Sequence, residues 1–374
     1  MMREGWEYKK LGDICNVING LWTGKKEPFI NVAVIRNTNF SKDCQLNLEN
    51  VAYIDVEAKQ FASRKLLCGD IIIEKSGGSE KQPVGRPILF NISEGDYSFS
   101  NFTSTLRIKE DAKVESSFLH KCLYASYLKG ETLKLQSKTT GLHNLNMKGY
   151  LRLNIPLPPK STQLAIVSEL DKINELIRLK KEQLKDFDNL AQSLFYEMFG
   201  DPVENEKGWE VKKLGEVYKM KSGDSLSTKS FEEGDIPVYG GNGISGYHNK
   251  YNKDGSYIII GRVGVYCGNV RIVKGRFWLT DNAFELLYDN SSQNEVFVCS
   301  LLTHLNLRKY ANAAAQPVIS NNTLKHVSIP LPPLPLQHFF AHRIEQIEHQ
   351  KAEVQKSITD LETLLASRMQ YWFE

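Results

Sequence analysis

Several glycine-rich segments of this 374-residue chain gather side chains that could form hydrogen bonds with nucleic acid. Residues 75–82, 137–140 and 239–249 are rich in Ser, Thr, Asn, Lys and Tyr. Arg and Lys can pair with guanine edges, Asn and Gln with adenine, and Ser, Thr and backbone amides with phosphate. The alternative is that these turns are simply solvated. The residue types therefore favour DNA contact as a hypothesis.

Sixteen side chains are candidates for DNA contact because of their chemistry. In the first half of the chain they are Lys75, Ser76, Lys81, Gln82, Arg86, Asn101, Lys138 and His143. In the second half they are Tyr239, Asn242, Ser245, His248, Arg262, Asn269, Arg271 and Asn282. For Arg262, within Gly261-Arg262-Val263-Gly264, the alternative is a turn in which its side chain caps carbonyl groups.

The motifs that would support catalysis fail on spacing or context. Gly241-Asn242-Gly243-Ile244-Ser245-Gly246 matches a dinucleotide-binding string, but polar residues follow it and predict no helix to hold a pyrophosphate. Residues 20–26 are one residue short of a phosphate-binding loop, and residues 70–75 lack the second half of a nuclease motif. His338 and His342 share a helical spacing without a further metal ligand. We expect no catalytic residues, metal or cofactor in this chain.

The length of 374 residues indicates two or three domains, with ample material for sizeable cores. Hydrophobic residues make up 41% of the chain, and no apolar run approaches the length of a membrane span. The six cysteines include no Cys-x-x-Cys pair, and the first residues resemble no export signal. We therefore expect a cytoplasmic protein with reduced thiols and no membrane partner.

The net charge of +3 is low for a protein that binds DNA by itself. Residues 1–155 hold 22 basic and 17 acidic side chains, and residues 201–328 hold 15 and 14. The excess of basic residues therefore lies in these two segments and not in residues 156–200 and 329–374.

The sequence contains an internal repeat. Gly5-Trp6-Glu7-Tyr8-Lys9-Lys10-Leu11-Gly12 recurs as Gly208-Trp209-Glu210-Val211-Lys212-Lys213-Leu214-Gly215. Ile155-Pro156-Leu157-Pro158-Pro159 recurs as Ile329-Pro330-Leu331-Pro332-Pro333, and Gln163 and Gln337 keep that register. The two offsets differ by 29 residues, so the copies share a frame and differ in their loops.

A long helix is predicted after each proline-rich motif. Hydrophobic residues follow alternating three- and four-residue steps, which is typical of a seam that packs against a partner helix. The seams are Ile166, Leu170, Ile173, Ile177, Leu184, Phe187, Ala191 and Leu194, and Phe340, Ile344, Ile347, Val354, Ile358, Leu361 and Leu365. Lys180 and Lys351 interrupt them. Each helix could pack on its own domain, but their length favours an antiparallel coiled coil with approximate two-fold symmetry.

We therefore predict an α+β fold of four segments. They are a first domain at 1–155, a helix at 156–200, a second domain at 201–328 and a helix at 329–374. Within the domains, strands are expected at 29–35, 71–74, 103–108, 257–260 and 270–273. One helix per domain is expected, at 118–135 and 295–310.

This arrangement resembles the specificity subunit of type I restriction-modification systems over essentially the whole chain. The two repeated motifs carry the resemblance, together with Ile236-Pro237-Val238-Tyr239-Gly240-Gly241-Asn242-Gly243, Gly261-Arg262-Val263-Gly264 and Asp281-Asn282-Ala283-Phe284. The resemblance implies two target recognition domains that each read half of an asymmetric site in double-stranded DNA, with the helices setting the spacing.

The resemblance also implies partner subunits. Two modification subunits would methylate adenine with S-adenosylmethionine, and restriction subunits could add ATP- and Mg²⁺-dependent activities, all outside this chain. Partners that contact phosphates would account for the low net charge. One rival hypothesis is a scaffold whose helices bind other proteins. The other is a fused methyltransferase or nuclease, which would need a motif such as Asn-Pro-Pro-Tyr that the sequence lacks.

Overall fold

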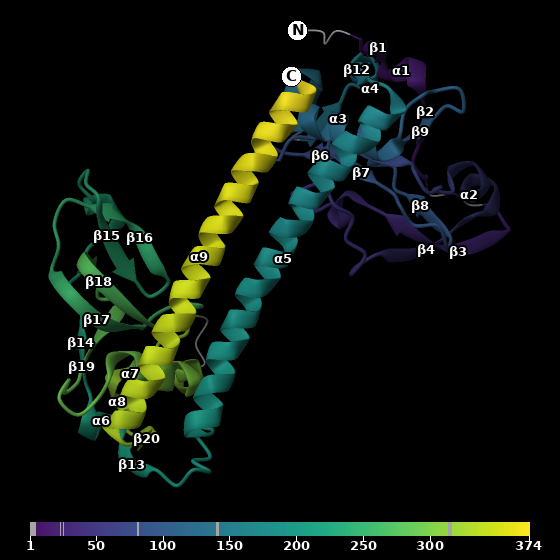
Figure 1. Ribbon diagram of the computed structural model, residues 1–374. Coiled ribbons are helices and arrows are strands. Elements are labelled where there is room, and N and C mark those ends of the chain that lie inside the picture. Colours follow the sequence, from purple (N-terminus) through teal and green to yellow (C-terminus); the bar gives the residue numbers. More distant parts are fainter. Residues whose placement is uncertain (1–4, 23, 25, 81, 140–141, 313–315) are drawn as a thin grey trace. The chain divides into compact units, whose positions relative to one another are not determined.

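The computed structural model describes residues 5–22, 24, 26–80, 82–139, 142–312 and 316–374, with residues 138 and 139 described by their backbone only (Figure 1). The chain divides into two compact units. Unit 1 comprises residues 1–179 and 358–374, and unit 2 comprises residues 180–357. Each unit therefore combines one β-rich domain with half of each long helix.

Unit 1 contains four small sheets with strand orders β1-β12, β2-β9-β5-β7, β4-β3-β8 and β10-β11-β6. The strands are β1 (Glu7–Lys10), β2 (Cys15–Asn19), β3 (Phe29–Ile35), β4 (Ala52–Glu57), β5 (Ile71–Glu74), β6 (Ser76–Gly78), β7 (Pro87–Leu89), β8 (Tyr97–Phe99), β9 (Thr103–Ile108), β10 (Gln136–Thr139), β11 (Leu142–Leu145) and β12 (Asn154–Leu157). The short helices are α1 (Leu11–Ile14), η1 (Asn37–Asn39), α2 (Ala58–Arg64), α3 (Ser116–Leu128), η2 (Glu131–Leu135) and α4 (Met147–Tyr150).

Unit 2 contains a six-stranded sheet of order β14-β19-β17-β18-β15-β16 and the pair β13-β20. The strands are β13 (Glu210–Lys213), β14 (Lys219–Ser222), β15 (Ile236–Gly240), β16 (Gly243–His248), β17 (Lys253–Gly261), β18 (Val270–Leu279), β19 (Ala283–Leu287) and β20 (Ser328–Leu331). The short helices are α6 (Leu214–Val217), η3 (Thr228–Ser230), α7 (Glu295–His304), η4 (Leu307–Tyr310) and α8 (Asn321–Leu324).

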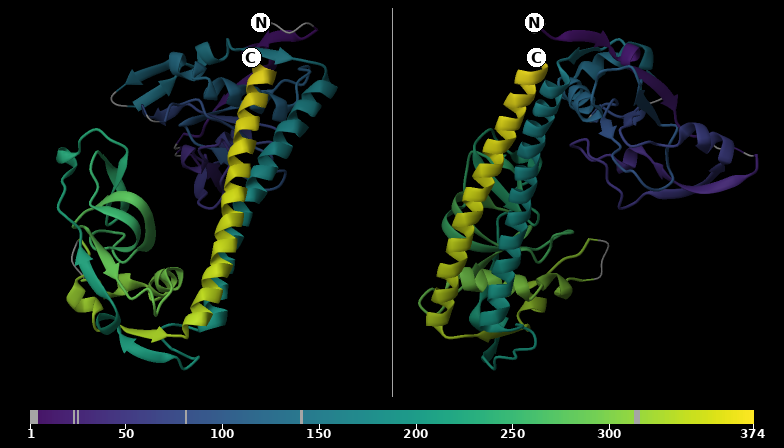
Figure 2. Two further views of the ribbon diagram at one scale, coloured as in Figure 1. Left: turned by 60° about the vertical axis from the view of Figure 1, so that its left-hand side comes forward. Right: turned by 45° about the vertical axis from the view of Figure 1, so that its right-hand side comes forward.

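The two long helices, α5 (Lys160–Phe199) and α9 (Leu334–Phe373), pair through the predicted seams. Within each unit their halves lie side by side and run antiparallel (Figure 2). In unit 1 Arg368 of α9 forms an ion pair with Glu169 of α5, and Trp372 Nε1 donates to the same carboxylate over 2.9 Å. In unit 2 Lys351 Nζ lies 2.8 Å from Asp188 Oδ1. The α+β class and the packed helix pair are thus confirmed.

The repeated proline-rich motif and its glutamine connect each long helix to its domain. Gln163 is fully buried, accepts a hydrogen bond from Glu115 N (2.9 Å) and donates to Pro158 O (2.9 Å). Gln337 repeats this arrangement, accepting from Asn294 N (2.9 Å) and donating to Pro332 O (2.8 Å). Each glutamine therefore satisfies backbone groups where the long helix begins and where α3 or α7 begins.

The single helix expected in each domain is shorter than predicted. After α3 the chain enters the left-handed region at Gly130 (φ 72°) and continues as η2. After α7, Asn306 (φ 50°) makes the same break before η4. The hydrophobic periodicity continues across both breaks, which is why the sequence predicted one longer helix.

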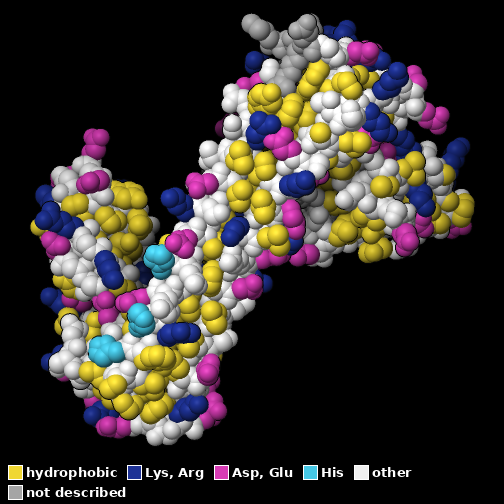
Figure 3. All heavy atoms as spheres, viewed as in Figure 1, with side chains coloured by type: hydrophobic (Ala, Val, Ile, Leu, Met, Phe, Trp, Pro, Cys, Tyr) yellow, Lys and Arg dark blue, Asp and Glu magenta, His cyan; other side chains and the backbone are white. Residues whose placement is uncertain are grey.

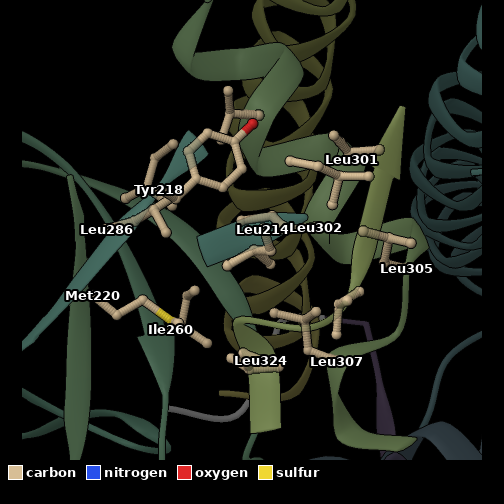
Figure 4. Packing of buried hydrophobic residues seen from close by; sticks show 14 of the residues in the cluster. Leu214, Tyr218, Met220, Ile260, Leu286, Leu301, Leu302, Leu305, Leu307 and Leu324 are labelled. Carbon is tan, nitrogen blue, oxygen red and sulfur yellow. The ribbon is translucent and has the colours of Figure 1, made fainter. Parts of the chain in front are cut away.

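The ends of the long helices contribute to the hydrophobic cores. In unit 2, Phe195, Phe199 and Phe340 join a buried cluster built around Leu214, Tyr218 and residues of α7. Figure 4 shows part of that cluster, with Leu301 and Leu302 of α7 beside Leu214 of α6. In unit 1, Ile166 and Leu170 of α5 join the equivalent cluster. Both domains are therefore packed directly onto the helix pair.

None of the helices in the described residues combines the length and apolar character needed to cross a membrane.

Candidate nucleic-acid interface

Both units build the same turn at the end of a buried isoleucine strand. In unit 1 β5 pairs with β9 so that Glu74 lies opposite Thr103, and in unit 2 β17 pairs with β19 so that Gly261 lies opposite Ala283. The next residue is basic in both units, Lys75 in the first and Arg262 in the second. The registers therefore make Lys75 and Arg262 structurally equivalent.

The backbone hydrogen bonds around the two basic residues confirm this equivalence. Lys75 N donates to Phe102 O and Arg262 N donates to Asn282 O, both over 2.9 Å. Lys75 O accepts from Leu145 N (2.8 Å), and Arg262 O accepts from Ile319 N (2.9 Å). Three backbone segments thus meet in the same way in each unit: the one with the basic residue, the one with Phe102 or Asn282, and the one with Leu145 or Ile319.

A glycine in the left-handed region lies two residues after each basic residue. Gly77 has φ 98° and Gly264 has φ 91°, conformations that L side chains rarely adopt. The neighbouring turns also match, since Thr103 N donates to Ser100 O and Ala283 N donates to Thr280 O. We call this arrangement the basic turn site. It comprises residues 75–77, 100–103 and 142–145 in unit 1, and residues 262–264, 280–283 and 316–319 in unit 2.

Neither basic group at the basic turn site has an acidic partner among the described residues. Lys75 Nζ donates only to Asn19 Oδ1, over 3.4 Å, and partial burial lowers the pKa of this lysine. Arg262 lies over the Phe284 ring at 5.3 Å, and its Nη1 donates to Asp281 O at 3.4 Å. Its buried Nε has no hydrogen-bond partner. Each site therefore presents a partly desolvated cation that an anionic or hydrogen-bond-accepting ligand would satisfy.

Four of the candidates from the first half of the chain gather at the basic turn site of unit 1. Ser76 Oγ lies 2.5 Å from Asn144 Oδ1, and His143 Nδ1 lies 3.0 Å from Gln136 Oε1. Asn101 belongs to the turn at 100–103, beside Lys75. Lys138 lies opposite His143 on β10, but its side chain is outside the described part of the structure, as is Lys81.

Arg86, another of the sequence-based candidates, lies in the interior of unit 1. It is 4% exposed, and its Nε lies 2.8 Å from Glu74 Oε2. Burial opposes its charge, but the hydrogen bond and the attraction from Glu74 raise its pKa. Gln82 is exposed, with its side-chain amide against the Arg86 guanidinium. Arg86 forms an interior ion pair because Glu74, at the end of the neighbouring strand β5, is buried beside it.

In unit 2 the candidates gather around the turn between β15 and β16. Arg271 lies so close to Gly243 that a Cβ there would be 2.6 Å from its Nη1. A Cβ on Gly241 would similarly meet the backbone of Val263 and Asn282. These glycines therefore allow the hairpin to approach the basic turn site, and they bring Asn242, Arg262, Arg271 and Asn282 into one region. Asn269 is exposed just before β18.

His248, a candidate in unit 2, is also buried. It is 3% exposed, its Nδ1 accepts from Glu232 N over 3.0 Å, and its ring packs edge-on against Trp278. Tyr239 is half-buried against Phe277, with ring centroids 5.5 Å apart. Ser245 is exposed and donates to Val238 O over 3.1 Å. His248 and Tyr239 therefore pack against Trp278 and Phe277, consecutive residues of β18 whose side chains lie on opposite faces of the sheet.

Several surface residues of these sites were not predicted from the sequence. Phe102 (41% exposed) occupies in unit 1 the position that Asn282 occupies in unit 2, and Val265 and Tyr266 follow Gly264. One signal was available, because Ile-Ile-Ile-x-basic-x-Gly occurs at 71–77 and again at 258–264. That third repeat relates Lys75 to Arg262 directly.

The surface chemistry within each unit is mixed. In the view of Figure 3, basic and acidic side chains alternate with hydrophobic ones on both units, and neither charge dominates. The described residues contain no group of three or more His, Cys, Asp or Glu that could hold a metal ion. Local geometry, rather than a broad positive surface, distinguishes the basic turn sites.

Comparison with known proteins identifies the family. Residues 3–186 and 206–363 match the type I restriction modification DNA specificity domain. The chain therefore belongs to this family, as a non-catalytic DNA specificity subunit of a type I restriction-modification system.

Individual relatives agree with this assignment. The chain is 29% identical over 260 residues to the EcoprrI specificity subunit of Escherichia coli, a match that covers 65% of this chain and 63% of that protein. It is 23% identical over 375 residues to a putative MjaX specificity subunit of Methanocaldococcus jannaschii, covering 92% and 87% of the two chains.

Solved structures share the fold across the whole chain. A type I restriction-modification S subunit from M. genitalium matches with a TM-score of 0.60 and 16% identity, covering 100% of this chain and 96% of that one. A chain from a study of assembly and conformational transition in a type I system matches with a TM-score of 0.66 and 18% identity, covering 100% and 99%. At these identities the likeness concerns the fold alone.

Proposed function

We propose that the chain reads a bipartite site in double-stranded DNA, one half with each domain. The observation that carries this proposal is the basic turn site, because each unit presents, at the same position among equivalent strands, a cation without an acidic partner in the described part of the chain. A cation held between backbone turns can contact a phosphate or the edge of a guanine. The two units share the backbone arrangement of this site and differ in its side chains. A protein that recognises two different DNA sequences with similar domains requires this combination.

The two half-sites are expected to differ. At equivalent positions of the two basic turn sites, Ser76 corresponds to Val263, Phe102 to Asn282 and His143 to Pro317. These pairs differ in donors, acceptors and apolar surface, which are the properties that distinguish base pairs in the major groove. The full site is therefore asymmetric rather than palindromic.

The proposed contact set is the sequence-based set without Arg86 and His248, whose side chains are committed to the interior. In unit 1 it centres on Lys75, Ser76, Asn101 and His143. In unit 2 it centres on Asn242, Arg262, Asn269, Arg271 and Asn282. Lys81, Gln82, Lys138, Tyr239 and Ser245 remain secondary candidates on the same loops and strands.

The partners follow from the family. We propose that two modification subunits dock on the chain and methylate adenine with S-adenosylmethionine, and that restriction subunits using ATP and Mg²⁺ can join them. In this scheme the segments 1–155 and 201–328 read DNA, and the helical segments 156–200 and 329–374 fix the spacing and dock the partners. The complex would act in the cytoplasm, where bacterial DNA is found.

Mapping of adenine methylation tests this function. The chain is co-expressed with the modification subunit encoded beside it, and methylated adenines in plasmid DNA are located by single-molecule sequencing. We expect one split, asymmetric motif that disappears when this chain is omitted. Methylation that is unchanged without this chain would refute the proposal.

Variants at the basic turn sites allow the same experiment to test which unit recognises which half-site. Lys75→Ala is expected to weaken or relax one half of the motif, and Arg262→Ala the other half. Lys274→Gln, an exposed lysine on β18 outside the basic turn site, serves as the matched control. If both site variants altered the same half, the assignment of one domain to each half-site would be wrong.

A further inference from the structure

The loop between β17 and β18 presents two large apolar side chains next to the polar basic turn site. Val265 is 64% exposed and Tyr266 is 50% exposed. They are the two central residues of a tight turn in which Cys267 N donates to Gly264 O over 3.0 Å. Around them stand Arg262, Asn269 and Asn282, which are hydrogen-bonding residues.

The loop is held in place from both sides. Gly264 N donates to Pro317 O (2.9 Å), and Gly268 N donates to Gly261 O (2.7 Å). Cys267 is 1% exposed and belongs to the hydrophobic core of unit 2. A Cβ on Gly268 would lie 2.5 Å from Arg308 N, so the loop is packed against the backbone of η4. The structure therefore fixes Val265 and Tyr266 outward on a constrained turn.

Covering exposed apolar side chains with a ligand is favourable in water, and a constrained turn loses little conformational entropy when it binds. Proteins that deform DNA place such side chains between adjacent base pairs, while neighbouring polar groups hold the backbone. A tyrosine also presents a flat ring on which any base can stack. The tip of this loop combines these two features beside Arg262, whose buried Nε has no hydrogen-bond partner among the described residues.

We propose that Val265 and Tyr266 form an apolar wedge that inserts at one base step of the half-site bound by unit 2. This inference rests on the proposed function and adds a mode of reading to it. Flexible pyrimidine–purine steps unstack most easily, so the wedge selects sequence through deformability in addition to hydrogen bonding.

The wedge is specific to unit 2. Counting along the chain from the equivalent residues Lys75 and Arg262, Gly78 and Ser79 of unit 1 correspond to Val265 and Tyr266 of unit 2, and Gly78 is buried. A Cβ at Gly78 would lie 2.7 Å from Val84 Cγ1, so the equivalent loop of unit 1 has no room for a side chain there. Unit 1 therefore has no wedge at the corresponding position of its loop.

Fluorescence of 2-aminopurine tests the wedge, because this base brightens when it is unstacked. The probe is a duplex carrying the methylation motif of the wild-type complex, with 2-aminopurine placed in turn at each position of the half-site assigned to unit 2. The complex with its modification subunits is used, with the methyl donor omitted. We expect brightening next to one base step in addition to any at the methylated adenine itself.

Variants of the tip separate stacking from hydrogen bonding. Tyr266→Ala should remove the brightening at that step and weaken binding about tenfold or more, while Tyr266→Phe should keep both. Val265→Ser should reduce the brightening. Val203 is a similarly exposed valine after α5, so Val203→Ser serves as the control and should leave the brightening unchanged.

The outcomes distinguish this inference from the proposed function. If the wild-type complex bound the duplex without regard to sequence, the function itself would fail. Sequence-specific binding without brightening at the step would overturn only the wedge. So would equal losses in Tyr266→Phe and Tyr266→Ala, which would indicate a hydrogen bond from the hydroxyl group. Loss of the modification subunits from the Tyr266→Ala complex would identify the tip as a protein contact and would also overturn it.

Discussion

At the scale of single residues, the surroundings of each basic group decide its role. Lys75, Arg86 and Arg262 were equivalent candidates in the sequence, yet only Arg86 has a carboxylate partner in the described structure. Arg86 and Glu74 neutralise each other in the interior, where an unpaired charge would be costly. Lys75 and Arg262 keep their charge available for a ligand.

Charge and shape at the basic turn sites predict distinct effects of substitution. Arg262→Lys keeps the charge but loses the planar fork of the guanidinium, so we expect specificity at one base pair to relax. Arg262→Ala should weaken binding by about 1–3 kcal/mol, or about 5- to 150-fold. Binding of the assembled complex to duplexes at several salt concentrations measures both. Equal affinity of Arg262→Ala and wild type at every salt concentration would remove Arg262 from the interface.

His120 predicts a pH dependence of stability in unit 1. Burial lowers its pKa from 6.5 to about 4, with further opposition from Lys121, and its Nε2 lies 3.3 Å from Pro87 O. The unfolded chain therefore takes up a proton near pH 6.5 while the folded chain does not. The stabilisation is complete above pH 6.5 and is lost as pH falls towards 4, by up to about 3 kcal/mol.

Urea unfolding at pH 7.5, 6 and 5 measures this dependence as a difference between wild type and His120→Gln. The variant removes the titrating group, so its stability should fall less steeply over that range. Parallel pH profiles for the two proteins would show that His120 is protonated equally in the folded and unfolded states.

At the scale of elements, the helix seams contribute to stability and also determine how the two long helices align. The apolar positions of both seams are buried or half-buried, and Lys351 interrupts one of them at 25% side-chain exposure. Its ammonium lies 2.8 Å from Asp188 and 2.9 Å from Glu348. A polar residue in a seam typically costs stability and favours one alignment of the helices.

Replacement of Lys351 by Leu tests whether this lysine lowers stability while favouring one alignment of the helices. Because the ion pairs are partly exposed, their loss should cost about 0–1 kcal/mol, and added apolar burial should offset it. We expect unchanged or slightly higher thermal stability, with more self-association of the chain. Ile358→Ala, which empties a position that is 2% exposed, serves as a contrast and should cost about 2–5 kcal/mol. A large loss in Lys351→Leu would instead show that the ion pairs dominate.

At the scale of the whole molecule, the chain duplicates a domain and attaches each copy to a helix of 40 residues. If the helix pair sets the distance between the half-sites, its length should determine the number of unspecified base pairs in the motif. The recognition of each half-site should then be separable from the spacing.

Insertion of one heptad into each helix tests this separation. Seven residues preserve the seam and add about 10.5 Å, which corresponds to about three base pairs of B-DNA. Methylation mapping should show both half-sites unchanged and the spacer lengthened by about three base pairs. An unchanged spacer would exclude the helices as the element that sets the spacing. Four inserted residues would shift the seam and should impair assembly.

The sequence by itself determined the duplication, the long helices and the chemical class of the surface. Seam hydrophobics, proline-rich motifs and the β5 and β9 bounds could be read directly, because periodicity and proline geometry act locally. The pairing of β5 with β9 and of β17 with β19, which makes Lys75 equivalent to Arg262, required the tertiary structure. So did the interior positions of Arg86 and His248 and the outward turn at Val265 and Tyr266. Burial and register depend on segments far apart in the chain, and a local pattern of residue types does not specify which of those segments meet.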